Sequence, residues 1–168
     1  MKIVAPPSPR SGPAWRSTFG VLAALALAAG TARAAEEPGD WPYYGGDEFG
    51  QRFSPLDEIT RENVGELEIA WIYRSGELGA GFARRNALAF EATPIHIGGS
   101  LYLSTPTNIV IALDAASGRE RWRYDPHIDR TVRYAEATSR GVSYWSAGDP
   151  HQSGPCSERL FEGTLDAR

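Results

Sequence analysis

Apolar and polar positions form a repeating pattern between residues 109 and 124. The run Ile109–Leu113 is short, apolar and rich in β-branched side chains, which is typical of a strand. Asp114–Gly118 has turn chemistry, and Gly118 can adopt a positive φ. Trp122 and Tyr124 then alternate with arginines, which predicts a half-buried strand. Because such a hairpin cannot bury its apolar face alone, the pattern predicts an all-β assembly of similar units.

Two further predicted strands precede this hairpin. Ile95–Ile97 is followed by Gly98-Gly99, a pair that favours a two-residue hairpin turn. Leu101–Ser104 is the predicted return strand, and Thr105–Asn108 is the predicted turn into the next strand. The order of strands and short turns predicts a four-stranded antiparallel meander between residues 95 and 124.

Upstream of the meander the pattern is less regular. Pro38–Phe53 is rich in glycine and aromatic residues without a period, which predicts an ordered loop that packs aromatic side chains. Thr60 is a suitable N-cap for a short helix over Arg61–Val64. Leu67–Tyr73 is predicted to be a strand, and Gly79–Ala89 is predicted to be a loop.

Downstream of the meander, a polar connection is predicted over Asp125–Ser139. Val142–Trp145 and Glu158–Phe161 have the composition of two more strands, and Gly163–Asp166 resembles another hairpin turn. The chain therefore contains the pattern of about one complete meander and two partial ones. We expect it to be the N-terminal part of a larger β-propeller or a similar repeat fold.

The first 34 residues have the pattern of an export signal. The apolar run Val21–Ala29 precedes the small-residue site Ala32-Arg33-Ala34, and basic residues stand earlier, at Lys2, Arg10 and Arg16. A membrane-spanning helix needs roughly 20 apolar residues, more than this run offers. We predict a cleavable signal peptide over residues 1–34, export to the periplasm and a folded domain over residues 35–168. An uncleaved N-terminal anchor is the alternative.

The net charge of residues 35–168 makes some classes of binding partner unfavourable. The 168-residue chain has 17 Lys and Arg residues and 21 Asp and Glu residues, and four of the basic residues precede position 35. Residues 35–168 therefore carry 13 basic and 21 acidic side chains, a formal net charge of −8, without any lysine. This negative surplus argues against nucleic acid or an anionic membrane surface as a partner.

Cysteine and histidine offer little for a redox or metal site. The single cysteine, Cys156, excludes an intrachain disulfide, and no Cys-x-x-Cys-His motif for a c-type haem is present. Cys156 is expected to be structural, either buried and inert or paired with a cysteine outside this chain. His96, His127 and His151 lack ligand spacing, so we predict no metal site.

The turn between residues 112 and 122 is part of a longer motif. Ala112-x-Asp114-x-x-Ser117-Gly118-x-x-x-Trp122 resembles the tryptophan-docking repeat of the quinoprotein dehydrogenases, with serine at position 117 where the family usually has threonine. Other stretches similar to this family occur in the family's order across residues 41–168: Trp41–Asp47, Arg52–Asp57, Ile59-Thr60, Asn63-Val64, Leu67, Ala70-Trp71, Glu91–Pro94, Arg140–Tyr144, Cys156, Arg159–Phe161 and Gly163–Asp166. The chain most resembles the membrane-associated glucose/quinate type of pyrroloquinoline quinone (PQQ)-dependent dehydrogenase.

The resemblance implies both a fold and a chemistry. The implied fold is an all-β, eight-bladed β-propeller with PQQ on its axis. PQQ oxidises an alcohol or sugar hydroxyl and passes electrons to ubiquinone or cytochrome c, with a calcium ion as Lewis acid and an aspartate as base. In relatives the calcium ligands and the catalytic aspartate come from later blades. We therefore expect no catalytic residue in this chain and no activity of the chain alone. The resemblance to the membrane-associated branch separately implies a peripheral association with a membrane.

Two residues that match the family motif are expected to bind the cofactor. A carboxylate at Glu91 can accept from a ring N–H of PQQ or share a proton with one of its carboxyl groups. The guanidinium of Arg140 suits a carboxylate bidentately, and Gly141 would let the backbone approach the ring. The alternatives are a solvated glutamate at the start of a strand and a surface arginine.

Other residues distinguish branches and competing functions. The methanol-dehydrogenase branch has two adjacent cysteines shortly before this arginine, whereas Tyr134–Ser139 contains none, which favours the glucose/quinate branch. Trp71 and Trp122 are expected to pack between neighbouring blades. The competing interpretation is a non-enzymatic propeller that acts as a scaffold or binding module. Such proteins share the tryptophan repeat but lack the Glu91–Pro94 and Arg140–Tyr144 motifs.

Overall fold

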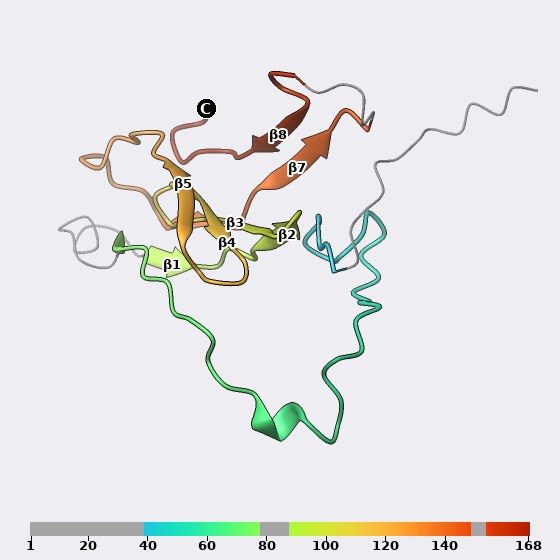
Figure 1. The fold of residues 1–168 in the computed structure, drawn as a ribbon. Helices are drawn as coiled ribbons and strands as arrows, with labels where there is room; N and C mark the ends of the chain where they lie inside the picture. The colour runs from blue at the N-terminus through green and yellow to red at the C-terminus, as the bar shows by residue number, and fades with distance from the viewer. Residues whose placement is uncertain (1–38, 78–87, 149–153) are drawn as a thin grey trace, which may run out of the picture. The chain divides into compact units, whose positions relative to one another are not determined.

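The computed structural model describes residues 39–77, 88–148 and 154–168 of the chain. Within these ranges it contains eight β-strands and one short 3₁₀ helix, η1 (Val64–Glu66), and no α-helix (Figure 1). The predicted all-β class is confirmed. No helix in the described ranges is long and apolar enough to cross a membrane. The predicted signal peptide over residues 1–34 lies outside the described residues.

The largest sheet is the predicted meander. It contains β2 (Ile95–Ile97), β3 (Ser100–Ser104), β4 (Val110–Asp114) and β5 (Glu120–Tyr124), each antiparallel to the next. The two glycines between β2 and β3 both have a positive φ, +53° and +70°, as a tight hairpin turn requires. The strands and turns predicted between residues 95 and 124 are therefore confirmed.

The core lies on both faces of β4. One face packs into a first apolar cluster: Trp71, Tyr73, Leu101, Leu103, Ile109, Ile111 and Leu113. The other face packs into a second apolar cluster: Ile95, Ile97, Tyr102, Val110, Val142, Tyr144 and Leu160. Adjacent residues of a strand point to opposite faces, so a strand covered on both sides needs apolar residues at successive positions. This requirement explains the uninterrupted apolar run in β4.

Strand β5 differs from its prediction. Every residue of β5 is exposed, and the Trp122 side chain retains 43% of its exposure, so the predicted half-buried strand is wrong. Within the described residues β4 is the neighbour of β5 in the sheet, and β5 forms its edge. An edge strand has fewer surrounding groups to cover its side chains than a central strand has.

The two predicted downstream strands form a separate hairpin. β7 (Ser143–Ser146) and β8 (Glu158–Phe161) are antiparallel, and β7 begins one residue later than predicted. Val142, the residue before β7, is buried in the second apolar cluster. The hairpin thereby packs against the meander through residues that include Val142 and Leu160.

A third sheet was not predicted. β1 (Leu88–Phe90) and β6 (Ala137–Ser139) pair in parallel. Both strands lie at the ends of segments predicted to be irregular, Gly79–Ala89 and Asp125–Ser139, and those predictions are wrong at their last residues. Each strand has only three residues, and their partners are far apart in the sequence, so neither produces a periodic pattern of its own.

Two upstream predictions also need correction. Arg61–Val64 is not a helix, because residues 61–63 form a turn and η1 begins only at Val64. The turn is closed by a 3.0 Å hydrogen bond from the Val64 N–H to the Thr60 carbonyl. Leu67–Tyr73 contains no strand. The segment instead contacts the meander through the side chains of Trp71 and Tyr73. A strand needs a backbone partner, and the structure describes none beside this segment.

The predicted aromatic loop is confirmed only in part. Trp41 pairs with His96 through two backbone hydrogen bonds of 2.7 and 3.1 Å, and its ring lies against Gly46. Phe49 and Phe53, in contrast, are 77% and 74% exposed. Pro38, at the start of the predicted loop, lies outside the described residues.

Candidate functional site

The two residues predicted to bind a cofactor form an ion pair. Arg140 Nη2 lies 3.1 Å from Glu91 Oε2. The Arg140 side chain is 84% exposed and the Glu91 side chain is 37% exposed. Exposed ion pairs contribute little to the free energy of unfolding, so the stability of the fold does not require this pair. The arrangement instead places two charged groups where a ligand can reach them.

The ladder between β1 and β6 explains why these residues meet. Glu91 directly follows β1, and Arg140 directly follows β6. Phe90 lies opposite Ser139 in a parallel register, so the next residue of each strand leaves the ladder at the same end. The unpredicted sheet is therefore the element that brings the two predicted residues together.

Gly141 holds the two strand ends close. The Thr93 N–H donates a 3.2 Å hydrogen bond to the Arg140 carbonyl. Gly141 has a φ of +124°, and a β-carbon on it would lie 2.9 Å from the Thr93 carbonyl oxygen. Glycine was predicted here to let the backbone approach a bound ring. In the structure, Gly141 lies close to the backbone of Thr93.

Four polar residues linked by side-chain contacts, here called the Ser139 cluster after the residue that precedes Arg140, were missed by the sequence analysis: Ser104, Asn108, Ser139 and Glu162. The Ser139 hydroxyl donates to Glu162 Oε1 at 2.9 Å, and Asn108 Nδ2 donates to the same oxygen at 3.0 Å. Burial raises the pKa of Glu162, and hydrogen bonds from its neighbours partly oppose that shift. No motif marked these residues, because they stand at strand ends and in turns that are distant in sequence.

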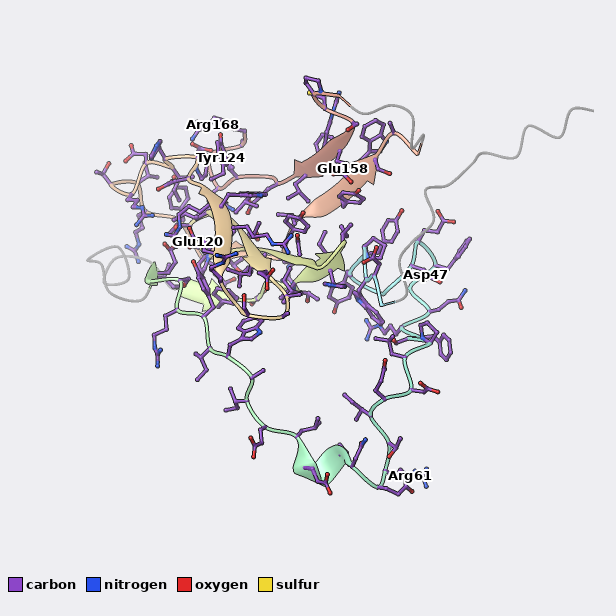
Figure 2. The ribbon with its side chains drawn as sticks, viewed as in Figure 1. Asp47, Arg61, Glu120, Tyr124, Glu158 and Arg168 are labelled. Carbon is purple, nitrogen blue, oxygen red and sulfur yellow. The ribbon has the colours of Figure 1, made fainter. Side chains whose placement is uncertain are left out.

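Trp71 docks on the turn between β4 and β5. Its indole Nε1 donates a 3.1 Å hydrogen bond to the Ala115 carbonyl. Nearby, the Tyr73 hydroxyl bonds to Glu120 on β5, which Figure 2 labels, and Arg123 Nη2 donates to the Tyr73 hydroxyl at 2.7 Å. Burial and the bond to Glu120 raise the pKa of Tyr73, so this hydroxyl is a structural donor. Trp71 was expected to pack between neighbouring blades; the contacts that the structure contains are with the turn between β4 and β5, and Trp71 is not in a strand.

A cavity in the described part of the chain lies apart from the ion pair. It has a volume of about 410 Å³ and is lined by residues of the meander and of the β7–β8 hairpin, among them Tyr102, Trp122, Tyr124, Tyr144, Glu158 and Arg159. Figure 2 labels two of these residues, Tyr124 and Glu158. Burial, and secondarily a 2.8 Å hydrogen bond to Glu158, raises the pKa of Tyr144 to about 12. Neither Glu91 nor Arg140 lines this cavity. Because the pKa of Tyr144 is raised, its hydroxyl is protonated at neutral pH and is not suited to act as a general base in this cavity.

Histidine and cysteine do not form a site in the described part of the chain. His96 Nδ1 lies 2.9 Å from the Gly39 carbonyl oxygen, and the His127 side chain is 87% exposed. Cys156 is exposed, so the buried alternative for this residue is wrong. His151 lies outside the described residues. Within those residues no group of three or more His, Cys, Asp or Glu side chains could hold a metal ion.

Comparison with known proteins agrees with the sequence motifs. Residues 41–168 match the model of the family described as glucose/ethanol/alcohol dehydrogenase, beta-propeller domain. The chain belongs to this family. The resemblance to quinoprotein dehydrogenases and the expectation of part of a β-propeller are both confirmed.

Relatives and solved structures of this dehydrogenase family extend well beyond the chain. A quinoprotein glucose dehydrogenase from Escherichia coli (strain K12) is 40% identical over 133 residues, which cover 77% of this chain and 17% of that protein. A glycerol dehydrogenase large subunit from Gluconobacter oxydans (strain 621H) is 36% identical, covering 80% of this chain and 18% of that protein. The chain thus spans about a sixth of the length of these relatives.

The structural neighbours are dehydrogenases of the same kind. A quinohemoprotein alcohol dehydrogenase from Pseudomonas putida HK5 has a TM-score of 0.59 and 35% identity, covering 77% of this chain and 16% of that chain. A quinohemoprotein alcohol dehydrogenase from Comamonas testosteroni has a TM-score of 0.58 and 31% identity, covering 78% of this chain and 17% of that chain. The meander is therefore one blade of the β-propeller domain of this family, and β7–β8 is part of another blade.

Proposed function

We propose that this chain forms part of a PQQ-dependent dehydrogenase that oxidises an alcohol or sugar hydroxyl, and that Glu91 and Arg140 hold the cofactor. The observation that carries this proposal is the meeting of the two residues at one end of the β1–β6 ladder. A chance pair of surface charges has no reason to coincide with the positions that the family motif selects.

The residues present fit a planar ligand that carries three carboxylates. A guanidinium has five N–H donors, and the structure gives Arg140 one ion pair among the described residues, so donors remain for a ligand carboxylate. Glu91 orients the guanidinium through its 3.1 Å contact and presents a carboxylate that can accept from a ring N–H. When bound, PQQ supplies the two-electron oxidation of the hydroxyl-bearing carbon.

The role of this chain is binding and orientation. The described residues provide no set of ligands for calcium, so any such ion would be held by other residues. We propose that the substrate pocket, the catalytic base and the calcium ligands lie outside these 168 residues. The purified 168-residue chain is then expected to show no PQQ-dependent dye reduction, and measurable reduction would contradict this part of the proposal.

The cellular setting is also a proposal. A signal peptide over residues 1–34 would direct the chain to the periplasm, where ubiquinone or cytochrome c would take the electrons, with peripheral association to the membrane. Fractionation of cells that produce the complete gene product, with an N-terminal sequence of the mature protein, tests the location. A mature protein that begins at Met1 in the cytoplasm would contradict it.

PQQ titration of the complete gene product tests the site. Arg140→Ala and Glu91→Gln are each expected to raise the dissociation constant for PQQ about tenfold or more, because each removes a charge-assisted contact. Arg61→Ala, which removes an exposed arginine beside η1, is the matched control and should leave the constant unchanged (Figure 2). Unchanged affinity in both site variants would favour the non-enzymatic scaffold instead.

A further inference from the structure

We propose that Glu162 is a positioning residue for Arg140 and acts through Ser139. This inference rests on the proposed function, in which Arg140 binds PQQ. Glu162 directly follows β8, whereas Arg140 follows β6, so the contact would couple the β7–β8 hairpin to the cofactor site. No sequence motif assigns Glu162 a role.

The hydrogen bonds of Ser139 define the connection. A serine hydroxyl has one proton, and a carboxylate can only accept, so Ser139 donates to Glu162 Oε1 at 2.9 Å. Ser104 must then donate to Ser139 across the 2.5 Å that separates their hydroxyl oxygens. The Gly141 N–H also donates to the Ser139 hydroxyl at 3.3 Å. This last bond spans Arg140, so the orientation of the Ser139 side chain restricts the backbone from which the Arg140 side chain projects.

Glu162 is itself held by Asn108. Asn108 is 1% exposed and has a φ of +63°, a conformation that asparagine tolerates better than most residues. Its Nδ2 donates to Glu162 Oε1 at 3.0 Å, and its Oδ1 accepts from the Leu165 N–H at 2.9 Å. The carboxylate and the chain that follows it are thereby fastened to the loop between β3 and β4.

The placement of Glu162 is not explained by stability. Its second oxygen, Oε2, is buried and has no hydrogen-bond partner among the described residues. A buried carboxylate oxygen without a partner costs free energy, and an apolar side chain of similar volume would avoid this cost. Among the described residues, this carboxylate accepts the hydrogen bond that fixes the orientation of Ser139 beside Arg140.

The test measures the dissociation constant for PQQ in the complete gene product. Glu162→Ala is expected to raise it about tenfold, because Ser139 loses its acceptor and is free to rotate. Glu162→Gln keeps an acceptor oxygen for Ser139 and Asn108, so it is expected to restore affinity to within about twofold of the unchanged protein. Glu158→Ala, at the start of the same strand, is the matched control and should leave the constant unchanged.

A double-variant cycle separates positioning from a general loss of structure. If Glu162 acts through Arg140, Glu162→Ala should cause no further loss of affinity in an Arg140→Ala background. Equal losses in both backgrounds, or wild-type affinity in Glu162→Ala, would overturn the positioning role while leaving Arg140 as a PQQ ligand. Unchanged affinity in Arg140→Ala would overturn the proposed function and the positioning role together.

Discussion

The indole ring of Trp71 lies directly against Gly118. A β-carbon on Gly118 would be 2.4 Å from Cδ2 of the ring, closer than any real contact of that kind. Gly118 also has a φ of +68°, so glycine is required there both by the backbone and by the neighbouring ring. Together with the indole bond to Ala115, this contact attaches the extended segment before residue 77 to the blade.

Gly118→Ala is expected to destabilise the protein strongly. The added methyl group collides with the Trp71 ring and strains the left-handed backbone, which together cost about 2–4 kcal/mol in the free energy of unfolding. Gly50→Ala is the matched control, because Gly50 has the same φ of +68° with nothing within 4 Å of its added β-carbon. The control is expected to cost roughly 1 kcal/mol. Urea denaturation of the complete gene product measures both, and equal costs would exclude the ring contact as a cause.

Gly141→Ala is expected to impair the cofactor site more than the fold. Its methyl group would meet the Thr93 carbonyl at 2.9 Å and push apart the strand ends that carry Glu91 and Arg140. We expect the dissociation constant for PQQ to rise about tenfold or more, as for removal of one charged contact. PQQ titration of this variant and of Gly163→Ala checks this expectation. Gly163→Ala serves as the control, because its added β-carbon meets nothing within 4 Å. Similar constants for the two variants would contradict it.

Serine and threonine are expected to be interchangeable at position 117. The Ser117 hydroxyl donates to Asp114 Oδ1 at 2.7 Å, and threonine carries the same donor. The hydrogen bond from Arg121, followed by those from Ser117, holds the pKa of Asp114 well below its usual range. Ser117→Ala should lower the melting temperature by a few degrees, whereas Ser117→Thr should leave it nearly unchanged. Equal melting temperatures for all three proteins would show that the hydroxyl does not contribute.

The hydroxyl of Tyr144 is expected to make stability fall at high pH. Burial first, and the bond to Glu158 second, raises its pKa from the ordinary tyrosine value of 10.0 to about 12 in the folded protein. The folded state therefore binds the Tyr144 proton more tightly than the unfolded state does. The resulting contribution to the free energy of unfolding is complete below about pH 10 and is lost as the pH rises toward about 12. The urea midpoint should decline less between about pH 10 and 12 in Tyr144→Phe than in the unchanged protein. Parallel declines would refute the assignment.

The local pattern of residues was enough to predict the meander and the β7–β8 hairpin. Strands β2 to β5 are joined by short turns that contain glycine, or proline and asparagine, so each pairing partner lies a few residues away and the register follows from the turns. Leu67–Tyr73 has a composition that favours a strand, yet composition cannot supply the backbone partner that a strand requires. Its prediction failed for that reason.

In the candidate site, too, some features were predictable from the sequence and others were not. Glu91 and Arg140 were selected by their resemblance to a family motif, and the chain's own sequence determined their residue types and the glycine beside them. Their 3.1 Å contact was decided only by the parallel ladder between β1 and β6. Likewise, no pattern pointed to Glu162, because its partners Ser139 and Asn108 come from distant segments. Sequence determines local turns and strands through short-range contacts, whereas a site built from non-local pairs exists only once the tertiary structure has closed them.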